Sequence, residues 1–195
     1  FYTTTFIAEQ AIKHLREHAA KFPDQPFFEY LAFTSPHFPI QALPEDIAIY
    51  QDRYQSGWDA IRKERYERMM KMGLVTCDLS VLDPAAAPRW NLNERQLQAR
   101  ISTNEIGHAV PWNSLNAGQK QFQAAKMAIH AAMIHRMDIE IGRVLYQLKA
   151  MGSLDNTLIL FMSDNGASAE EIIRGDGHDP AAPLGSARTF LGVGP

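Results

Sequence analysis

The chain has 195 residues, of which 46% are hydrophobic and 21% are charged, and its formal net charge is −3. This composition is typical of a globular protein and excludes an intrinsically disordered chain. The small negative charge gives no electrostatic reason to expect nucleic acid or an anionic membrane surface as a partner. No stretch of the sequence reaches the roughly 20 apolar residues that a membrane-spanning helix needs.

The two ends of the chain indicate a piece of a longer protein. The first residue is Phe1, with no initiator methionine and no charged segment leading into an apolar run. The last residues, 192–195, have the composition of a loop. We therefore expect an internal fragment, whose signal region is not in the chain.

The first predicted elements are a helix over residues 5–22 and a strand over residues 27–34. Apolar residues recur at helical spacing in the first segment, hydroxyl side chains at 3–5 are available as caps, and Pro23 ends the pattern. The second segment, F-F-E-Y-L-A-F-T, is apolar almost throughout, which is typical of a strand covered on both faces in a parallel sheet. It ends at S-P-H-F-P, where two prolines prevent further pairing.

The middle of the chain, residues 45–115, has a looser pattern. A helix is predicted over 58–72, where basic and acidic residues alternate along a solvated face. The rest of this region is polar and mixed, so we interpret it as an elaboration over the core.

The longest periodic segment, residues 116–151, predicts a helix that Gly152 ends. An apolar, strand-like segment follows at 157–162, and residues 167–195 are loop by composition. Helix followed by strand, twice over, predicts an α/β layered fold with a mostly parallel sheet. One face of the long helix carries the apolar residues Met127, Ala131, Ile134, Ile141, Leu145 and Leu148.

Polar residues follow both predicted strands. Asp164 and Asn165 come directly after one strand, and His37 lies just past the other. In open α/β sheets ligands bind outside the carboxyl ends of the strands, so we expect these groups at one edge of the sheet. The two oxygen ligands suit Ca²⁺ or Mg²⁺, and Gly166 would allow a sharp turn beside the ion.

The residues alone leave other interpretations open. Asp-Asn-Gly is also good turn chemistry, and two ligands cannot complete a site for Ca²⁺, which takes about 6–8 oxygens. His37 is also explained as a partly buried histidine that bonds to the backbone. His178, near Asp176 and Asp179, is better explained by a polar turn than by metal binding.

Other conspicuous side chains have structural explanations. His130 and His135 fall within the long predicted helix, and we interpret both as packing or helix-surface residues. Trp90 and Trp112 could stack on sugar rings, but packing is the better explanation for both. Cys77 is the only cysteine, so the chain can form no internal disulfide and contains no C-x-x-C metal pair.

Three blocks in order along the chain resemble a known family. They are F-F-E-Y-L-A-F-T-S-P-H-F-P, the helix with R-M-D and I-G-R-V-L, and D-N-T-L-I-L-F-M-S-D-N-G. This chain resembles the type I sulfatases, the arylsulfatase branch of the alkaline phosphatase superfamily. The resemblance implies an alkaline-phosphatase-like layered α/β/α fold, with residues 1–195 as a central fragment of the catalytic domain and 167–195 on its active-site side.

The resemblance also implies a reaction, the hydrolysis of a small-molecule or glycan sulfate ester to an alcohol or phenol plus sulfate. Asp164 and Asn165 match family ligands of a divalent cation, usually calcium. His37 matches a residue that contacts the sulfate and helps to protonate the leaving oxygen. The formylglycine nucleophile comes from a C-x-P-S-R motif, which V-T-C-D-L-S around Cys77 does not match, so we expect it outside this chain.

The fragment alone is therefore expected to be inactive, and family habit implies a periplasmic or secreted protein. Two alternatives remain. In the first, the full protein would be a phosphate or phosphonate ester hydrolase of the same superfamily; in the second, it would be a non-catalytic homologue that binds sulfated glycans. An upstream C-x-P-S-R motif would favour the sulfatase.

Overall fold

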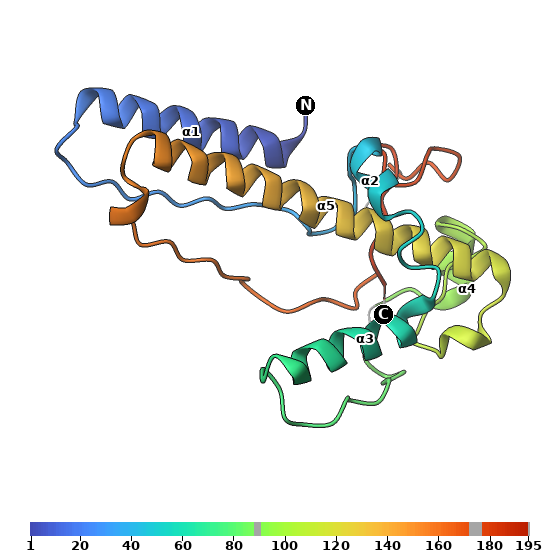
Figure 1. Cartoon of the computed structure of the whole chain (residues 1–195). Helices are drawn as coiled ribbons and strands as arrows, with labels where there is room; N and C mark the ends of the chain where they lie inside the picture. Colours follow the sequence, from blue (N-terminus) through green and yellow to red (C-terminus); the bar gives the residue numbers. More distant parts are fainter. Residues whose placement is uncertain (88–90, 172–176, 195) are drawn as a thin grey trace. The chain divides into compact units, whose positions relative to one another are not determined.

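The computed structural model describes residues 1–87, 91–171 and 177–194, which form helices and loops (Figure 1). They divide into two compact units, and the division falls within the longest helix. Unit 1 comprises Phe1–His37 and Met133–Gly166, and unit 2 comprises Phe38–Ala132 and Ala167–Pro195. No helix in the described ranges is long and apolar enough to cross a membrane.

The helices are α1 (Thr3–Lys21), α2 (Pro44–Tyr50), α3 (Gly57–Lys71), α4 (Glu94–Arg100) and α5 (Ala117–Ala150), with 3₁₀ turns η1 (Trp112–Ser114) and η2 (Leu154–Asn156).

The predicted α/β fold is wrong for the described residues, which contain no β-strand. The segments 27–34 and 157–162 have no regular secondary structure, and apolar side chains point into solvent, with Phe28 91% and Leu158 85% exposed. An apolar run shows only that a segment would suit a sheet. A strand also needs a neighbour for its backbone N–H and C=O groups, and no described segment pairs with either run.

The three longer helix predictions are confirmed. Segments 5–22, 58–72 and 116–151 correspond to α1, α3 and α5 within two residues at each end. Two short helices, α2 and α4, were not predicted. The start of α4 carried a readable signal, because Asn93 and Gln96 form a capping box in which each side chain accepts a bond from the other's backbone N–H, at 3.0 and 3.1 Å.

Unit 1 has its core between α1 and the second half of α5. Figure 1 shows these helices side by side. The predicted hydroxyl cap of α1 is wrong, because Tyr2 occupies the capping position without a side-chain bond. Thr5 instead donates to Oε1 of the buried Glu140 at 2.9 Å, which ties the start of α1 to α5. The buried core residues are Ala8, Ala11, Ile12, Leu15, Val144 and Leu148.

The predicted apolar face of α5 is only partly right. Of its six residues only Leu148 is buried, and Ile134 is 41% exposed. The prediction assumed a single packing partner, but between residues 122 and 133 the helix is covered on more than one side. The buried residues there are Phe122, Gln123, Ala124, Lys126, Ala128, Ile129, Ala132 and Met133.

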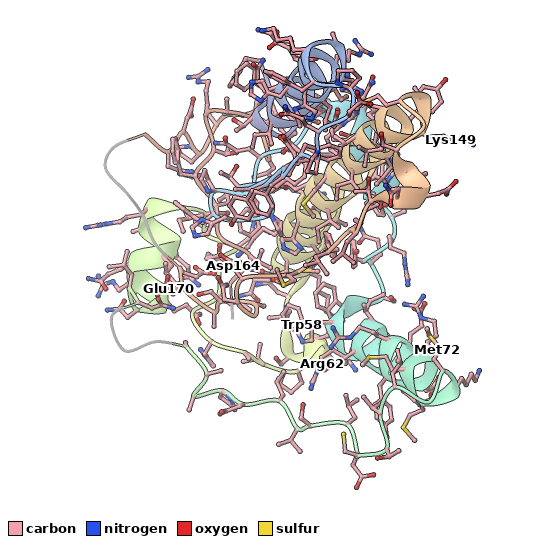
Figure 2. All side chains as sticks on the ribbon, turned by 90° about the vertical axis from the view of Figure 1, so that its left-hand side faces the viewer. Trp58, Arg62, Met72, Lys149, Asp164 and Glu170 are labelled. Carbon is pink, nitrogen blue, oxygen red and sulfur yellow. The ribbon has the colours of Figure 1, made fainter. Side chains whose placement is uncertain are left out.

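The core of unit 2 contains a pair of tryptophans. Trp58, at the start of α3 in Figure 2, and Trp112 make a T-shaped contact with ring centroids 4.8 Å apart. Trp58 Nε1 donates to the carbonyl oxygen of Val110 at 2.9 Å, and the backbone N–H of Trp112 donates to the Asp59 carboxylate at 2.9 Å. Packing is therefore the role of Trp112, as expected, whereas Trp90 lies outside the described residues.

The last part of unit 2 is loop in residues 167–171 and 177–194, as predicted. Backbone bonds fix it to the segment before α2. The N–H of Ile40 donates to the carbonyl of Leu191 at 2.9 Å, and the N–H of Ala42 donates to that of Gly185 at 3.0 Å. These bonds hold the loop without a helix or strand.

Candidate functional site

Asp164 and Asn165 lie on an exposed bend in unit 1 (Asp164 is labelled in Figure 2). The Ser163 hydroxyl donates to the backbone carbonyl of Asn165 at 2.6 Å. The Asn165 side-chain NH₂ donates to the carbonyl of Gly166 at 2.8 Å, which leaves its side-chain oxygen for another partner. Both residues therefore present an oxygen ligand to solvent from a short, locally bonded bend.

The backbone at position 166 does not require glycine in this structure. Gly166 does not have a positive φ, and a β-carbon placed there would meet no atom within 4 Å. The bend would accept a side chain at this position, because its shape comes from the Ser163 and Asn165 bonds.

His37 lies in the bend that follows the first apolar segment, and its side chain is exposed. Its backbone N–H donates to the carbonyl of Thr34 at 2.9 Å. The buried Ser35 hydroxyl donates to the carbonyl of Met133 on α5 at 3.3 Å, which fixes the bend to the helix. Pro36 and Pro39, on either side, both follow cis peptide bonds.

All three predicted site residues thus belong to unit 1. Among the residues that the structure describes, no group of three or more His, Cys, Asp or Glu is close enough to hold a metal ion. The donor set of Asp164 and Asn165 fits the hard oxygen chemistry that calcium prefers, but it supplies only part of a coordination shell. His37, Asp164 and Asn165 therefore remain predictions as site residues.

His178 has a structural role, as its sequence context suggested. The backbone N–H of Phe190 donates to His178 Nδ1 at 3.1 Å, so Nδ1 carries no proton. Nε2 then donates to the carbonyl of Ile101 at 3.2 Å. This neutral tautomer joins the last loop to the end of α4, while Asp176 lies outside the described residues.

The remaining histidines predicted to be structural are consistent with that interpretation. His130 is half-buried on α5, and burial lowers the pKa of its imidazole. His135 is half-buried on the same helix. The free Cys77 is exposed after α3.

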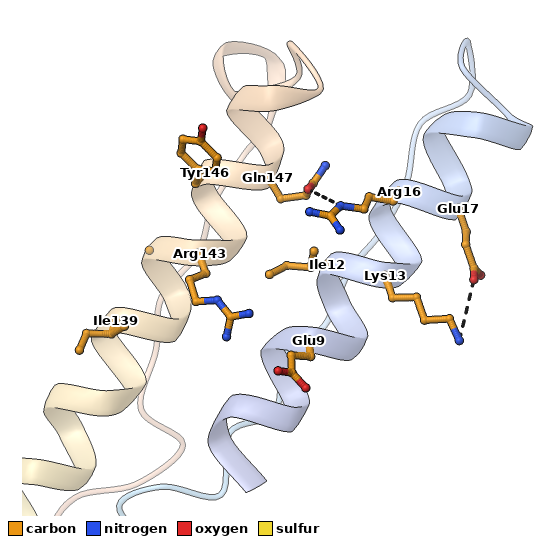
Figure 3. A pocket seen from close by; sticks show the side chains of 10 residues that line it. Glu9, Ile12, Lys13, Arg16, Glu17, Ile139, Arg143, Tyr146 and Gln147 are labelled. Carbon is orange, nitrogen blue, oxygen red and sulfur yellow. Dashed lines mark hydrogen bonds and ion pairs between the residues drawn. The ribbon is translucent and has the colours of Figure 1, made fainter. Parts of the chain in front are cut away.

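A groove of about 590 Å³ lies between α1 and α5 in unit 1 (Figure 3). Several of its polar side chains already have partners across or along the helices. Arg16 Nε donates to Gln147 Oε1 at 2.7 Å, and Lys13 lies 3.9 Å from Glu17. None of the predicted site residues lines it. The lining residues are Glu9, Ile12, Lys13, Arg16, Glu17, Ile139, Gly142, Arg143, Tyr146 and Gln147.

The sequence reasoning missed a buried charged cluster in unit 2. Lys126 Nζ lies 2.9 Å from both carboxylate oxygens of Glu105 and 3.2 Å from Oε1 of Glu171. All three side chains are at most 2% exposed. Because the three residues are far apart in the sequence, no local pattern could have identified them.

Comparison with known families decides the relationship of the chain. The Sulfatase family matches residues 1–189. The chain belongs to the sulfatase family.

Individual relatives agree with this membership. The sulfatase chain is 35% identical over 167 residues to an uncharacterised sulfatase of Schizosaccharomyces pombe, covering 86% of this chain and 26% of that protein. It is 30% identical over 168 residues to an arylsulfatase of Klebsiella aerogenes, covering 86% of this chain and 31% of the relative. An arylsulfatase of Clostridium perfringens is 24% identical over 165 residues, covering 85% of this chain and 26% of that protein. The chain thus spans roughly a quarter to a third of the length of these relatives.

Proposed function

We propose that the protein containing this chain hydrolyses sulfate esters to an alcohol or phenol plus sulfate. The family match over residues 1–189 carries this proposal. Two of the relatives are named arylsulfatases, which supports the same reaction class. Because the chain covers only part of such proteins, the activity belongs to the whole protein and the isolated chain is expected to be inactive.

In this proposal Asp164 and Asn165 hold a calcium ion through one carboxylate and one amide oxygen. Both side chains are exposed on a bend whose internal bonds leave these oxygens available. The other ligands come from residues beyond this pair, since calcium takes about 6–8 oxygens. When bound, the cation offsets negative charge that develops on the sulfuryl oxygens.

His37 in this proposal contacts the sulfate group and gives a proton to the leaving oxygen. An imidazole suits this role because its ordinary pKa lies near neutral pH, where it can both hold and release a proton. The hydrogen bond from Ser35 to Met133 anchors its bend to α5, so the backbone that carries the histidine is held in place. The nucleophile is a formylglycine outside this chain, because the surroundings of Cys77 do not match the required motif.

The test uses the full-length protein, co-expressed with a formylglycine-generating enzyme. Hydrolysis of para-nitrophenyl sulfate and para-nitrophenyl phosphate is measured before and after calcium chelation. We expect preferential sulfate hydrolysis that chelation abolishes and added calcium restores. In Asp164→Ala we expect calcium affinity to fall by more than about 100-fold, because even residues behind metal ligands contribute about 10–100-fold.

Asp155→Ala is the matched control, since Asp155 is another exposed carboxylate of unit 1 and lies outside the predicted pair. It should keep both activity and calcium affinity. A preference for the phosphate ester would move the protein to phosphoryl chemistry. A folded protein with verified formylglycine that hydrolyses neither ester and binds a sulfated glycan would contradict the catalytic proposal.

A further inference from the structure

The buried cluster in unit 2 contains two carboxyl groups and one ammonium group. Lys126 comes from α5, Glu105 from the segment between α4 and η1, and Glu171 from the loop after the candidate metal ligands. These are the charged groups that face Glu171 among the described residues. With both carboxyl groups ionised, the cluster would carry one uncompensated negative charge away from water.

The two carboxyl groups are bonded very differently. Glu105 accepts two bonds from Lys126, and its Oε1 also accepts bonds from the Gln123 side chain at 2.7 Å and the Ile106 backbone N–H at 3.1 Å. Glu171 accepts one bond, from Lys126, and its Oε2 is buried with no hydrogen-bond partner within the described ranges. Hydrogen bonds to the ionised form of a carboxyl group favour that form, so the surroundings support a negative charge at Glu105 better than at Glu171.

Glu171 is therefore the group that holds a proton. The pKa of its carboxyl group is raised to about 7, mainly by burial; nearby Lys126 opposes this rise and the Glu105 carboxylate adds to it. A protonated Glu171 leaves one carboxylate and one ammonium, which balance. Loss of that proton near neutral pH introduces a buried charge whose desolvation is costly.

Two parts of the loop cover the cluster. Asn91 fixes the first by accepting a bond from the Glu171 backbone N–H at 3.2 Å and donating to the Ala169 carbonyl at 3.0 Å. The second is the segment 192–194, where Gly194 has φ +86°. A β-carbon at Gly194 would collide with Oε1 of Glu171 and lie 3.1 Å from Lys126 Nζ, so only glycine lets the backbone close over these groups.

We propose that Glu105, Lys126 and Glu171 form a proton-dependent clasp, which holds the loop segment 192–194 closed over the cluster while Glu171 is protonated. When Glu171 gives its proton to solvent, the segment opens and water reaches the carboxylate. The Asn91 bonds carry no charge, so they keep residues 169–171 attached in both states. The clasp does not depend on sulfatase activity, and it couples the mobility of the last loop to pH.

The experiment measures amide hydrogen exchange of the full-length protein from pH 6 to 8.5, expressed as protection relative to the unfolded rate at each pH. We expect protection of peptides covering 185–194 to fall by at least about tenfold across neutral pH, since each unit of pKa difference corresponds to tenfold in an equilibrium. Glu171→Gln keeps the shape of the side chain without a titrating proton, so protection should not change with pH.

Glu105→Gln provides an independent variant. It leaves one carboxylate facing one ammonium, so ionisation of Glu171 creates no excess charge and the transition near neutral pH should disappear. Glu67→Gln, which removes an exposed carboxylate from α3, should behave like the wild type. Constant protection of residues 185–194 in the wild type would overturn the clasp, whether or not the variants fold. A transition that persists unchanged in Glu105→Gln would overturn its charge-balance basis.

Discussion

Asp164 and Glu171 are seven residues apart, yet the two acidic side chains have opposite surroundings. Asp164 is exposed on a bend with local bonds, whereas the Glu171 side chain is 2% exposed against an ammonium group and a second carboxyl group. Asp164 can therefore bind a ligand with little effect on the stability of the fold, whereas Glu171 can affect that stability without binding a ligand. Substitutions of the exposed candidate site residues should therefore change activity alone, whereas substitutions in the buried cluster should change stability.

The largest expected effect is that of His37→Gln on the full-length protein. If His37 protonates the leaving oxygen, kcat for an alkyl sulfate should fall by about 10²–10⁴-fold. The loss should be smaller for para-nitrophenyl sulfate, whose leaving oxygen needs less help from an acid. Because His37 is exposed, Tm should stay close to the wild-type value.

His14→Gln, on the exposed face of α1, is the control and should leave both readouts unchanged. Equal losses on the two esters would argue against a proton-donor role for His37. A large fall in Tm would instead make His37 a structural residue and weaken the contrast between the exposed and buried groups.

Lys126→Met should have the next largest effect, on the free energy of unfolding. Removing one partner of a buried ion pair leaves an uncompensated charge and typically costs about 3–5 kcal/mol. Urea denaturation of the full-length protein at pH 6 measures this loss. Lys63→Met removes a lysine whose side chain is 72% exposed and should change stability little. Equal effects of the two substitutions would show that the cluster does not stabilise the fold.

Glu171 should make the stability of the protein depend on pH. In the unfolded chain its carboxyl group titrates near 4.5, and in the folded protein near 7. Between these values the folded state binds more protons than the unfolded state, so stability falls as pH rises from about 4.5 to 7 and then levels off. The contribution is about 3 kcal/mol, because one unit of pKa corresponds to 1.36 kcal/mol.

Other groups titrate in the same range, so the readout is the difference in unfolding free energy between wild type and Glu171→Gln at each pH. The wild type should lose unfolding free energy relative to Glu171→Gln as pH rises from about 4.5 to 7. A difference that is constant from pH 4.5 to 8 would show that Glu171 has the same proton affinity in both states.

The smallest effect is expected at the exposed ion pair of Arg53 and Glu64. Arg53 donates to both oxygens of Glu64 at 2.8 Å, and this interaction lowers the pKa of the Glu64 carboxyl group. Water and salt screen such a pair, so Glu64→Gln should leave Tm within the scatter of repeated scans. A loss of unfolding free energy comparable to that of Lys126→Met would contradict the distinction between surface and buried charges.

The sequence predicted the helices well because their signals are local. The apolar spacing in α1 and α5 and the position of Gly152 after α5 are properties of neighbouring residues. The Gly152 and Ser153 N–H groups donate to the carbonyls of Lys149 and Leu148, as expected for a glycine-terminated helix. The capping box at Asn93 was equally local and could have identified α4.

The features that depend on distant residues could not be predicted. A strand at 157–162 requires a partner, and its apolar pattern does not show whether one is present in the chain. The bonds from Lys126 span 21 residues to Glu105 and 45 to Glu171. The candidate ligands Asp164 and Asn165 were recognised from a motif. The motif gives their positions in the sequence, but it does not give the other ligands of a complete coordination shell.

The contact between Trp58 and Trp112 gives unit 2 its own spectroscopic signal. Two indoles with centroids 4.8 Å apart and ring planes at 80° are close enough for their electronic transitions to couple. Such coupling produces paired bands in circular dichroism that disappear when the rings separate. Since both rings belong to unit 2, a melt followed at those bands would report the unfolding of that unit alone, without any added label.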